Sequence, residues 1–204
     1  KRLAEELPNA YWANQFDNTA NRDFHMATTG PEIWEQTGGQ IDGFVAAIGS
    51  GGTLAGVSTY LKSQTTKVCT VCVDPFGAAM YGWFKHKDLN DVMGGSITEG
   101  IGQVRVTKNI ENAPIDDAYR IDDKPIIEMV HYLAHKEGLF LGSSAALNVL
   151  GAIKLAKQLG PGKTIVTILC DGAGRYLSRL FNERWLQEKD LTPKSKGLEF
   201  VDLL

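Results

Sequence analysis

Apolar residues follow two patterns along this chain: short continuous runs, and longer segments with helical spacing. The continuous runs are IDGFVAAI at 41–48, KVCTVCVD at 67–74 and TIVTILCD at 164–171. A strand that is covered on both faces needs apolar residues at nearly every position, so these runs predict buried parallel strands. Three shorter segments predict further strands: NAYWAN at 9–14, AYRI at 118–121 and LFLG at 139–142.

The segments between these runs predict helices. They are residues 19–36 with a break at TTGPE, 53–62, FGAAMYGWF at 76–84, 124–136, 143–160, and RYLSRLFNERWLQEK at 175–189 as an amphipathic closing helix. Pro31 suits a first helical turn, and Gly160 and Pro161 suit a helix end. Strands that alternate with helices favour an α/β fold, a three-layer domain with a mainly parallel sheet.

The two ends of the chain have weaker patterns. KRLAEEL is typical of the last turns of a helix that ends at Pro8, and no initiator Met precedes it, so we expect the C-terminal part of a longer protein. The 204 residues suit one buried core. We assign 1–189 to this domain and 190–204 to a tail without clear period, which either packs on a partner subunit or is a disordered end.

Composition excludes several classes of protein. Charged residues make up 22% of the chain, the net charge is -3 and no block of like charge occurs, so we expect small molecules or proteins as partners, with no nucleic acid and no membrane. No run approaches the roughly 20 apolar residues of a spanning helix, and no signal pattern opens the chain. We expect a soluble, cytoplasmic protein.

The three cysteines indicate a reducing compartment, because an odd, low count argues against a disulfide framework. Cys69 and Cys72 have the spacing of a redox pair. They lie in a predicted strand, however, where alternation directs them to opposite faces, and this favours buried structural thiols.

A glycine-rich loop follows the first buried run and precedes a helix. Its residues are Gly49, Ser50, Gly51, Gly52 and Thr53. Glycines let the backbone approach a ligand, unpaired N–H groups point outward at a helix start, and the helix dipole adds positive charge. The loop therefore predicts a phosphate site, with a tight turn that binds no ligand as the alternative.

Three classes of phosphate ligand compete for this loop. A P-loop is excluded, because no Gly-Lys-Ser/Thr follows. A dinucleotide site is the main rival, since Asp74 ends the next strand at the spacing of a ribose-binding acid. Leu54 stands where such a site has its third glycine, which counts against that rival. A cofactor with a single phosphate is the third class.

Six motifs in this order resemble the cysteine synthases (O-acetylserine sulfhydrylases) among the fold type II pyridoxal-phosphate enzymes. They are NQFDNTAN, TTGPEIWEQT, GSGGTLAGV, EGIGQ, EGLFLGSSAA and GRYLS. The resemblance covers residues 1–188 and only the C-terminal domain of that family. It implies pyridoxal 5′-phosphate as cofactor, O-acetylserine and sulfide as substrates, and a homodimer when the protein is complete.

The resemblance also implies roles for individual residues. The loop from Gly49 to Thr53 would hold the cofactor phosphate, and Ser144 would face the pyridine nitrogen. A neutral hydroxyl near the positive end of a helix dipole disfavours a protonated pyridinium, although Ser143 or Ser144 could also merely cap the helix. Gln15 would help to bind the substrate carboxylate, and Gly100 would lie over the cofactor in the EGIG loop.

Other features of the family are absent or altered. The Schiff-base lysine and the Thr-Ser-Gly-Asn-Thr loop belong to the other domain, so no catalytic residue is expected in this chain and a missing N-terminal domain would have to supply both. The turn CDGAG at Cys170 and Asp171 departs from the family's pattern. His131 and His135 have a zinc-like spacing but lie at or beyond the apolar arc of their helix, which favours solvated histidines.

These observations favour a cysteine synthase that makes L-cysteine and acetate by β-replacement. A cystathionine β-synthase, which uses homocysteine instead of sulfide, remains an alternative because no residue here identifies the second substrate. A non-catalytic fragment that binds a partner is another alternative, and a dinucleotide-binding protein is the third.

Overall fold

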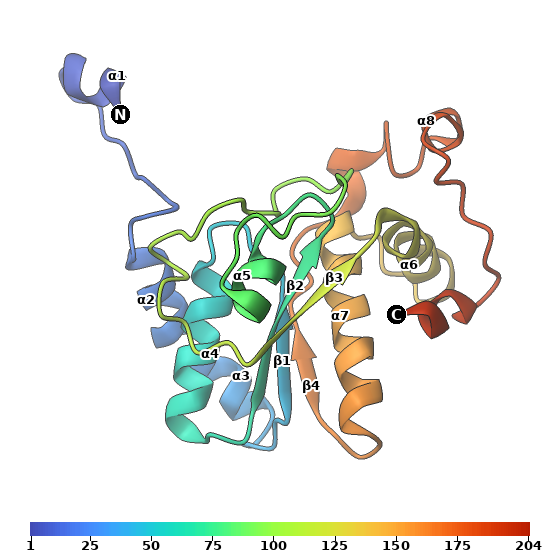
Figure 1. The fold of residues 1–204 in the computed structure, drawn as a ribbon, viewed down its shortest axis with the longest axis horizontal. Helices are drawn as coiled ribbons and strands as arrows, with labels where there is room; N and C mark the ends of the chain where they lie inside the picture. The colour runs from blue at the N-terminus through green and yellow to red at the C-terminus, as the bar shows by residue number, and fades with distance from the viewer.

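A four-stranded parallel sheet forms the centre of the computed structural model, which describes the backbone of residues 1–204 and every side chain except that of Leu203. The strands are β1 (Gly43–Ala46), β2 (Cys69–Pro75), β3 (Asp117–Ile121) and β4 (Ile165–Thr167), in the spatial order β3-β2-β1-β4. Helices cover both faces of this sheet (Figure 1), as the alternation of strands and helices predicts. The three-layer α/β fold is therefore confirmed.

One face of the sheet is covered by helices from the first half of the chain. Two of them, α4 (Gly52–Gln64) and α5 (Met80–His86), contact the strands, and the other two, α2 (Ala20–Ala27) and α3 (Thr29–Gln36), pack on α4. Phe44, Cys72 and Leu54 belong to the apolar core on this side, and each is fully buried.

The second half of the chain covers the other face. It supplies α6 (Asp123–Lys136) and α7 (Ser143–Leu159), followed by η1 (Ala173–Tyr176), α8 (Glu183–Glu188) and η2 (Glu199–Leu203). Val45, Val71 and Leu147 belong to the core on this side. Cys69 also contacts this core while Cys72 lies in the other, so the prediction that the two thiols face opposite sides is confirmed. The three cysteines are free, and burial raises the pKa of Cys72.

The order of the strands reverses at β1. From β1 the chain passes through α4 to β2 on one side, whereas β4 returns to pair with β1 on the other side, with Val45 opposite Thr167. Ligands of open α/β sheets bind at the carboxyl ends of the strands where the order reverses. The fold therefore places the candidate site at the ends of β1 and β4.

Three predicted elements differ in the structure. NAYWAN forms no strand, and Tyr11 and Trp12 are exposed, because no neighbouring strand pairs with this segment among the described residues. LFLG makes only an isolated bridge between Leu141 and Gly172. The closing helix predicted over 175–189 is interrupted, since Asn182 accepts a hydrogen bond from the Trp185 N–H and begins α8 there.

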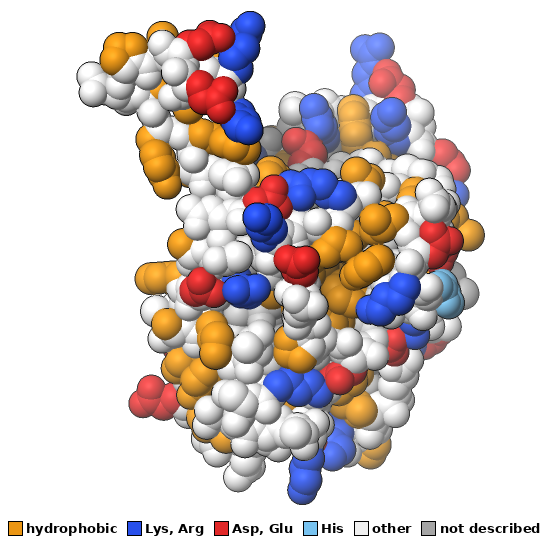
Figure 2. Space-filling model, turned by 60° about the vertical axis from the view of Figure 1, so that its left-hand side comes forward, with side chains coloured by type: hydrophobic (Ala, Val, Ile, Leu, Met, Phe, Trp, Pro, Cys, Tyr) orange, Lys and Arg blue, Asp and Glu red, His pale blue; other side chains and the backbone are white. Residues whose placement is uncertain are grey.

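The two ends of the chain differ in how they pack. The segment from α1 (Arg2–Glu6) to residue 13 extends away from the domain (Figure 1), and exposed apolar side chains on it are visible in Figure 2. The tail packs on the domain itself: Phe200 and Val201 are buried in the core beside α6, and Lys157 donates to the Val201 carbonyl at 2.6 Å.

Charges of both signs are interspersed on the face shown in Figure 2, in agreement with the absence of like-charge blocks in the sequence. Within the part of the chain that the structure describes, no helix is both long and apolar enough to cross a membrane.

Candidate phosphate-binding site

A cavity of about 460 Å³ opens at the carboxyl ends of β1 and β4. It is lined by the glycine loop, by the 99–101 segment, by the start of α7 and by the turn after β4. Of the predicted site residues, six line it: Gly49, Ser50, Gly51, Thr53, Gly100 and Ser144. Segments that lie more than 100 residues apart in the sequence therefore meet at one site.

The glycine loop has a backbone that requires glycine at two positions. Gly51 has φ 92°, in the left-handed region, and immediately precedes α4. A Cβ on Gly49 would lie 2.8 Å from the Gly100 carbonyl oxygen. The Gly52 N–H at the start of α4 donates to the Ser50 hydroxyl at 3.3 Å, whereas no side-chain cap is made at Gly51, so the remaining N–H groups of the first turn are available to an anion in the cavity.

Side chains from two other segments fix the shape of this loop. Asn21 donates from Nδ2 to the Ser50 hydroxyl at 2.7 Å, and the Thr107 hydroxyl donates to the Ser50 carbonyl at 2.7 Å. Because Ser50 Oγ accepts from Asn21, its own proton can point toward the cavity. These two contacts within the chain fix the shape of the loop at Ser50.

Ser144 lies at the start of α7, where it is 6% exposed and lines the cavity. The residue before the helix is Gly142, and no side chain makes a capping hydrogen bond there. The alternative that Ser143 or Ser144 caps this helix through its side chain is therefore wrong. The hydroxyl of Ser144 lies near the thiol of Cys170, an exposed residue; partial desolvation of this thiol raises its pKa, and the hydrogen bond with Ser144 opposes that rise.

Asn148 was not predicted from the sequence and connects the ends of β1 and β4. Its Oδ1 accepts from the Ala47 N–H at 2.7 Å, and its Nδ2 donates to the Ile168 carbonyl at 2.8 Å. Asn148 lies one turn after Ser144 on the same face of α7. An amide side chain on an otherwise apolar helix face is the signal in the sequence that could have found it.

The turn after β4 places two further polar side chains, Asp171 and Tyr176, in the cavity wall. The Tyr176 hydroxyl donates to Asp171 Oδ2 at 2.6 Å, and this hydrogen bond raises the pKa of Tyr176 to about 12. The other carboxylate oxygen, Oδ1, is buried and has no hydrogen-bond partner among the described residues. Glu99, which also lines the cavity, pairs with the Arg179 guanidinium.

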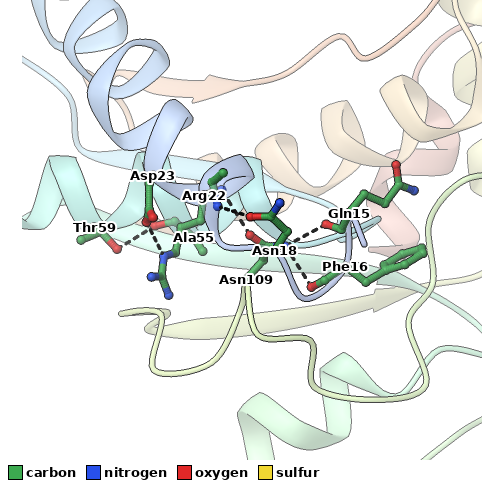
Figure 3. A network of polar contacts seen from close by, with 9 residues as sticks. Gln15, Phe16, Asn18, Arg22, Asp23, Ala55, Thr59 and Asn109 are labelled. Atoms are coloured by element: carbon green, nitrogen blue, oxygen red, sulfur yellow. Dashed lines mark hydrogen bonds and ion pairs between the residues drawn. The ribbon is translucent and has the colours of Figure 1, made fainter. Parts of the chain in front are cut away.

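Gln15 lies outside the residues that line the cavity, and its side chain is exposed. Its backbone is nevertheless fixed, because Asn109 donates from Nδ2 to the carbonyls of Gln15 and Phe16 at 2.9 Å each. Asn109 also accepts from the Arg22 N–H at the start of α2 (Figure 3). The predicted substrate role of Gln15 stays a prediction.

Asp74 is fully buried and is therefore unsuited to bind a ribose. Its Oδ2 accepts from the Tyr81 N–H at 2.9 Å at the start of α5, and burial raises its pKa to about 7. The structural role of this carboxyl argues against the dinucleotide alternative.

The histidines form no catalytic or metal set. Within the described residues no group of three or more potential metal ligands occurs. His131 is half-buried, and its Nε2 lies 2.8 Å from the Leu180 carbonyl, so the expectation that it is solvated is wrong. His135 is exposed, as expected.

Comparison with known proteins decides the family. Residues 1–171 match the family model described as pyridoxal-phosphate dependent enzyme. The chain belongs to this family. It is 49% identical over 195 residues to "Cysteine synthase 1" of Neurospora crassa, and this match covers 94% of this chain and 52% of that protein. Cysteine synthase 1 of Emericella nidulans is also 49% identical, over 94% of this chain and 53% of that protein.

A solved structure agrees with this assignment. The crystal structure of the O-acetylserine dependent cystathionine beta-synthase from Helicobacter pylori matches with a TM-score of 0.79 and 36% identity. The match covers 87% of this chain and 56% of that chain. The chain therefore spans about half the length of the relatives that it matches.

The residues of the cavity fit the cofactor of this family, pyridoxal 5′-phosphate. The cavity volume suits a small ligand, and the glycine loop offers backbone N–H groups and two hydroxyls without a lysine or a magnesium ligand. At Gly49 the backbone of the glycine loop lies against the backbone at Gly100, so a side chain at Gly49 would collide with the Gly100 carbonyl oxygen. The loop thus suits the phosphate of this cofactor.

Proposed function

We propose that this chain is the portion of a cysteine synthase that binds the cofactor phosphate. The single observation that carries this proposal is the cavity in which the loop from Gly49 to Thr53 faces the start of α7 across the ends of β1 and β4. In the complete protein, O-acetylserine and sulfide would give L-cysteine and acetate. The similarity to curated cysteine synthases supports this reaction.

Each side of the cavity would bind a different part of pyridoxal 5′-phosphate. The first-turn N–H groups of α4, with the hydroxyls of Ser50 and Thr53, would hold the phosphate. Gly52 belongs to the same loop but does not line the cavity, and it lies against Asn21. Ser144 would lie at the pyridine nitrogen, where a neutral hydroxyl keeps the ring unprotonated.

The substrate side involves the outer segments. Gln15 would bind the substrate carboxylate, and the backbone around Gly100, which has φ 78°, would lie over the bound cofactor. When bound, pyridoxal phosphate supplies an electron sink at the substrate carbon, and the residues of this chain hold it in place and exclude water.

A further segment would complete the enzyme. The relatives are about twice as long as this chain, which supports a missing N-terminal domain that carries the Schiff-base lysine and the carboxylate-binding loop. We therefore place no catalytic residue in this chain and expect it to be inactive alone. We propose residues 1–189 as the phosphate-binding domain, residues 190–204 as its tail, a homodimer for the complete protein, and a cytoplasmic location, the last in keeping with three free cysteines.

A cystathionine β-synthase is the second candidate. The structural match to an O-acetylserine dependent enzyme of that type from Helicobacter pylori favours it over unrelated activities. Both candidates share the first half of the reaction, in which acetate leaves O-acetylserine, and they differ only in the thiol that is added.

The test has a binding arm and an activity arm. The chain should bind pyridoxine 5′-phosphate, which lacks the reactive aldehyde, and should not bind NAD, as measured by calorimetry. The complete protein should release acetate from O-acetylserine and form cysteine with sulfide faster than cystathionine with homocysteine. Binding of NAD in place of the phosphorylated pyridoxine would refute the proposal, and a preference for homocysteine would select the second candidate. Binding without any acetate release by the complete protein would indicate a non-catalytic partner-binding protein.

A further inference from the structure

A line of three side chains connects the outer helices to the phosphate loop. His25 on α2 lies between Thr29 on α3 and Thr53 on α4. Its Nδ1 is 2.8 Å from the Thr29 hydroxyl oxygen, and its Nε2 is 3.1 Å from the Thr53 hydroxyl oxygen. Of these three residues, only Thr53 lines the cavity.

The helix packing holds the imidazole of His25 in this place. Gly56 lies one turn after Thr53 on α4, and a Cβ there would be 2.7 Å from His25 Cβ and 2.4 Å from the Arg22 carbonyl oxygen. The absence of a side chain at Gly56 lets α2 lie directly against α4. The distance between His25 and Thr53 is therefore set by backbone contact between two helices.

Partial burial lowers the pKa of His25 from its ordinary value of 6.5, which favours the neutral imidazole near pH 7. A neutral imidazole has one N–H donor and one acceptor nitrogen, so only two hydrogen arrangements are possible. If Nε2 accepted from Thr53, the hydroxyl proton would point away from the cavity and its lone pairs would repel phosphate oxygens. If Nε2 donates to Thr53, the hydroxyl proton of Thr53 can point into the cavity.

The arrangement in which Nε2 donates to Thr53 also gives Nδ1 of His25 a hydrogen-bond partner. Nδ1 must then accept, and the Thr29 hydroxyl is placed to donate to it. The three donors would then run in one direction, from Thr29 to His25, to Thr53 and to the phosphate. A chain of hydrogen bonds with a common direction strengthens its last member.

We propose that His25 is a positioning residue for cofactor binding: as the Nε2–H tautomer, selected by Thr29, it orients the Thr53 hydroxyl so that it donates to the phosphate. This inference rests on the proposed function, since it requires phosphate in the loop. It also extends the binding site beyond the loop, because the Thr53 hydroxyl can donate to phosphate only when His25 Nε2 donates to Thr53.

The experiment compares pyridoxine 5′-phosphate with pyridoxine on the folded chain. The ratio of the two affinities measures what the phosphate contributes. His25→Leu removes the donor behind Thr53 and should lower this ratio about tenfold, the effect of one hydrogen bond to a charged group. His25→Gln can still donate to Thr53 and should restore the ratio to within about threefold of the wild-type value. His135→Gln, on an exposed part of α6, is the matched control and should change nothing.

The tautomer gives a readout besides affinity. In 15N spectra of the complex, His25 should show a pyrrole-like Nε2 and a pyridine-like Nδ1. Thr29→Val should shift the tautomer equilibrium and lower the ratio, whereas Thr29→Ser, which keeps the hydroxyl, should do neither.

The outcomes separate this inference from the proposed function. If the wild-type chain does not prefer the phosphorylated compound, the proposed function fails and this inference fails with it. If the preference is present but Nε2 is pyridine-like, or if His25→Leu binds as wild type does, only the role of His25 is overturned. Loss of binding in both His25→Leu and His25→Gln, with unchanged backbone spectra, would also refute it, because rescue by the remaining donor is the expected result.

Discussion

Replacement of Asp74 by Asn should remove the loss of stability that the Asp74 carboxyl causes as the pH rises. The carboxyl of Asp74 is fully buried, its Oδ1 has no hydrogen-bond partner among the described residues, and its pKa is raised from 3.8 to about 7. Between these two values the folded state binds more protons at this residue than the unfolded state does. The contribution of Asp74 to stability is therefore fully present below the unfolded pKa of 3.8 and is lost as the pH rises to about 7.

The size of the effect follows from the shift. Each pKa unit corresponds to about 1.4 kcal/mol, so the shift of Asp74 costs about 4 kcal/mol above pH 7. Relaxation around a buried charge reduces such costs, and we expect a change of about 2–4 kcal/mol. Asn keeps an oxygen that can accept from the Tyr81 N–H but carries no titrating proton.

The assay is urea unfolding of the wild-type chain and of Asp74→Asn at intervals from pH 4 to pH 8. The variant's free energy of unfolding, relative to wild type, should rise across this range by the amount given above. Other titrating groups contribute to both proteins and largely cancel in the difference.

Asp17→Asn is the control with the opposite sign. The hydrogen bond from Arg105 holds the pKa of Asp17 below its usual range, so its contribution is present above the unfolded pKa and is lost as the pH falls. This variant should lose stability relative to wild type as the pH rises through the region below and around 3.8, so for this pair the series begins well below pH 3.8, and the difference should stay nearly level above about pH 5. A difference between wild type and Asp74→Asn that stays flat from pH 4 to pH 8 would refute the assignment of a raised pKa to Asp74.

Three further substitutions test the site. Gly51→Ala places a side chain at φ 92° and should cost about 1–3 kcal/mol of stability by urea unfolding, with weaker binding of pyridoxine 5′-phosphate; unchanged binding would mean that the loop does not hold the phosphate. Asn148→Leu leaves the Ala47 N–H and the Ile168 carbonyl without partners and should cost about 2–4 kcal/mol in the same assay, whereas a neutral result would show that this amide does not connect the strand ends. Ser144→Ala in the complete protein should retain the cofactor with an altered absorbance spectrum and slower acetate release; an unchanged enzyme would show that Ser144 has no role at the pyridine ring.

Parts of the site could be found from the sequence because their chemistry is local. A run of glycines and hydroxyls between a buried strand and a helix is typical of an anion site, and Gly49, Ser50, Gly51 and Thr53 do line the cavity. An amide on the apolar face of α7 marks Asn148 as unusual, but neither its role nor that of the pair of Asp171 and Tyr176 follows from a local pattern. Their roles depend on partners across the cavity, and no spacing rule in the sequence encodes those partners.

The sequence by itself determined the class of fold and the position of the glycine loop between the first strand and its helix. Strands covered on both faces must be apolar throughout, helices need one apolar side, and these requirements are visible residue by residue. Tertiary structure alone decided the order β3-β2-β1-β4, which brings the ends of β1 and β4 together at one cavity. It also decided that NAYWAN forms no strand and that His25 lies behind Thr53, because strand pairing and contacts between helices depend on distant residues that local patterns do not specify.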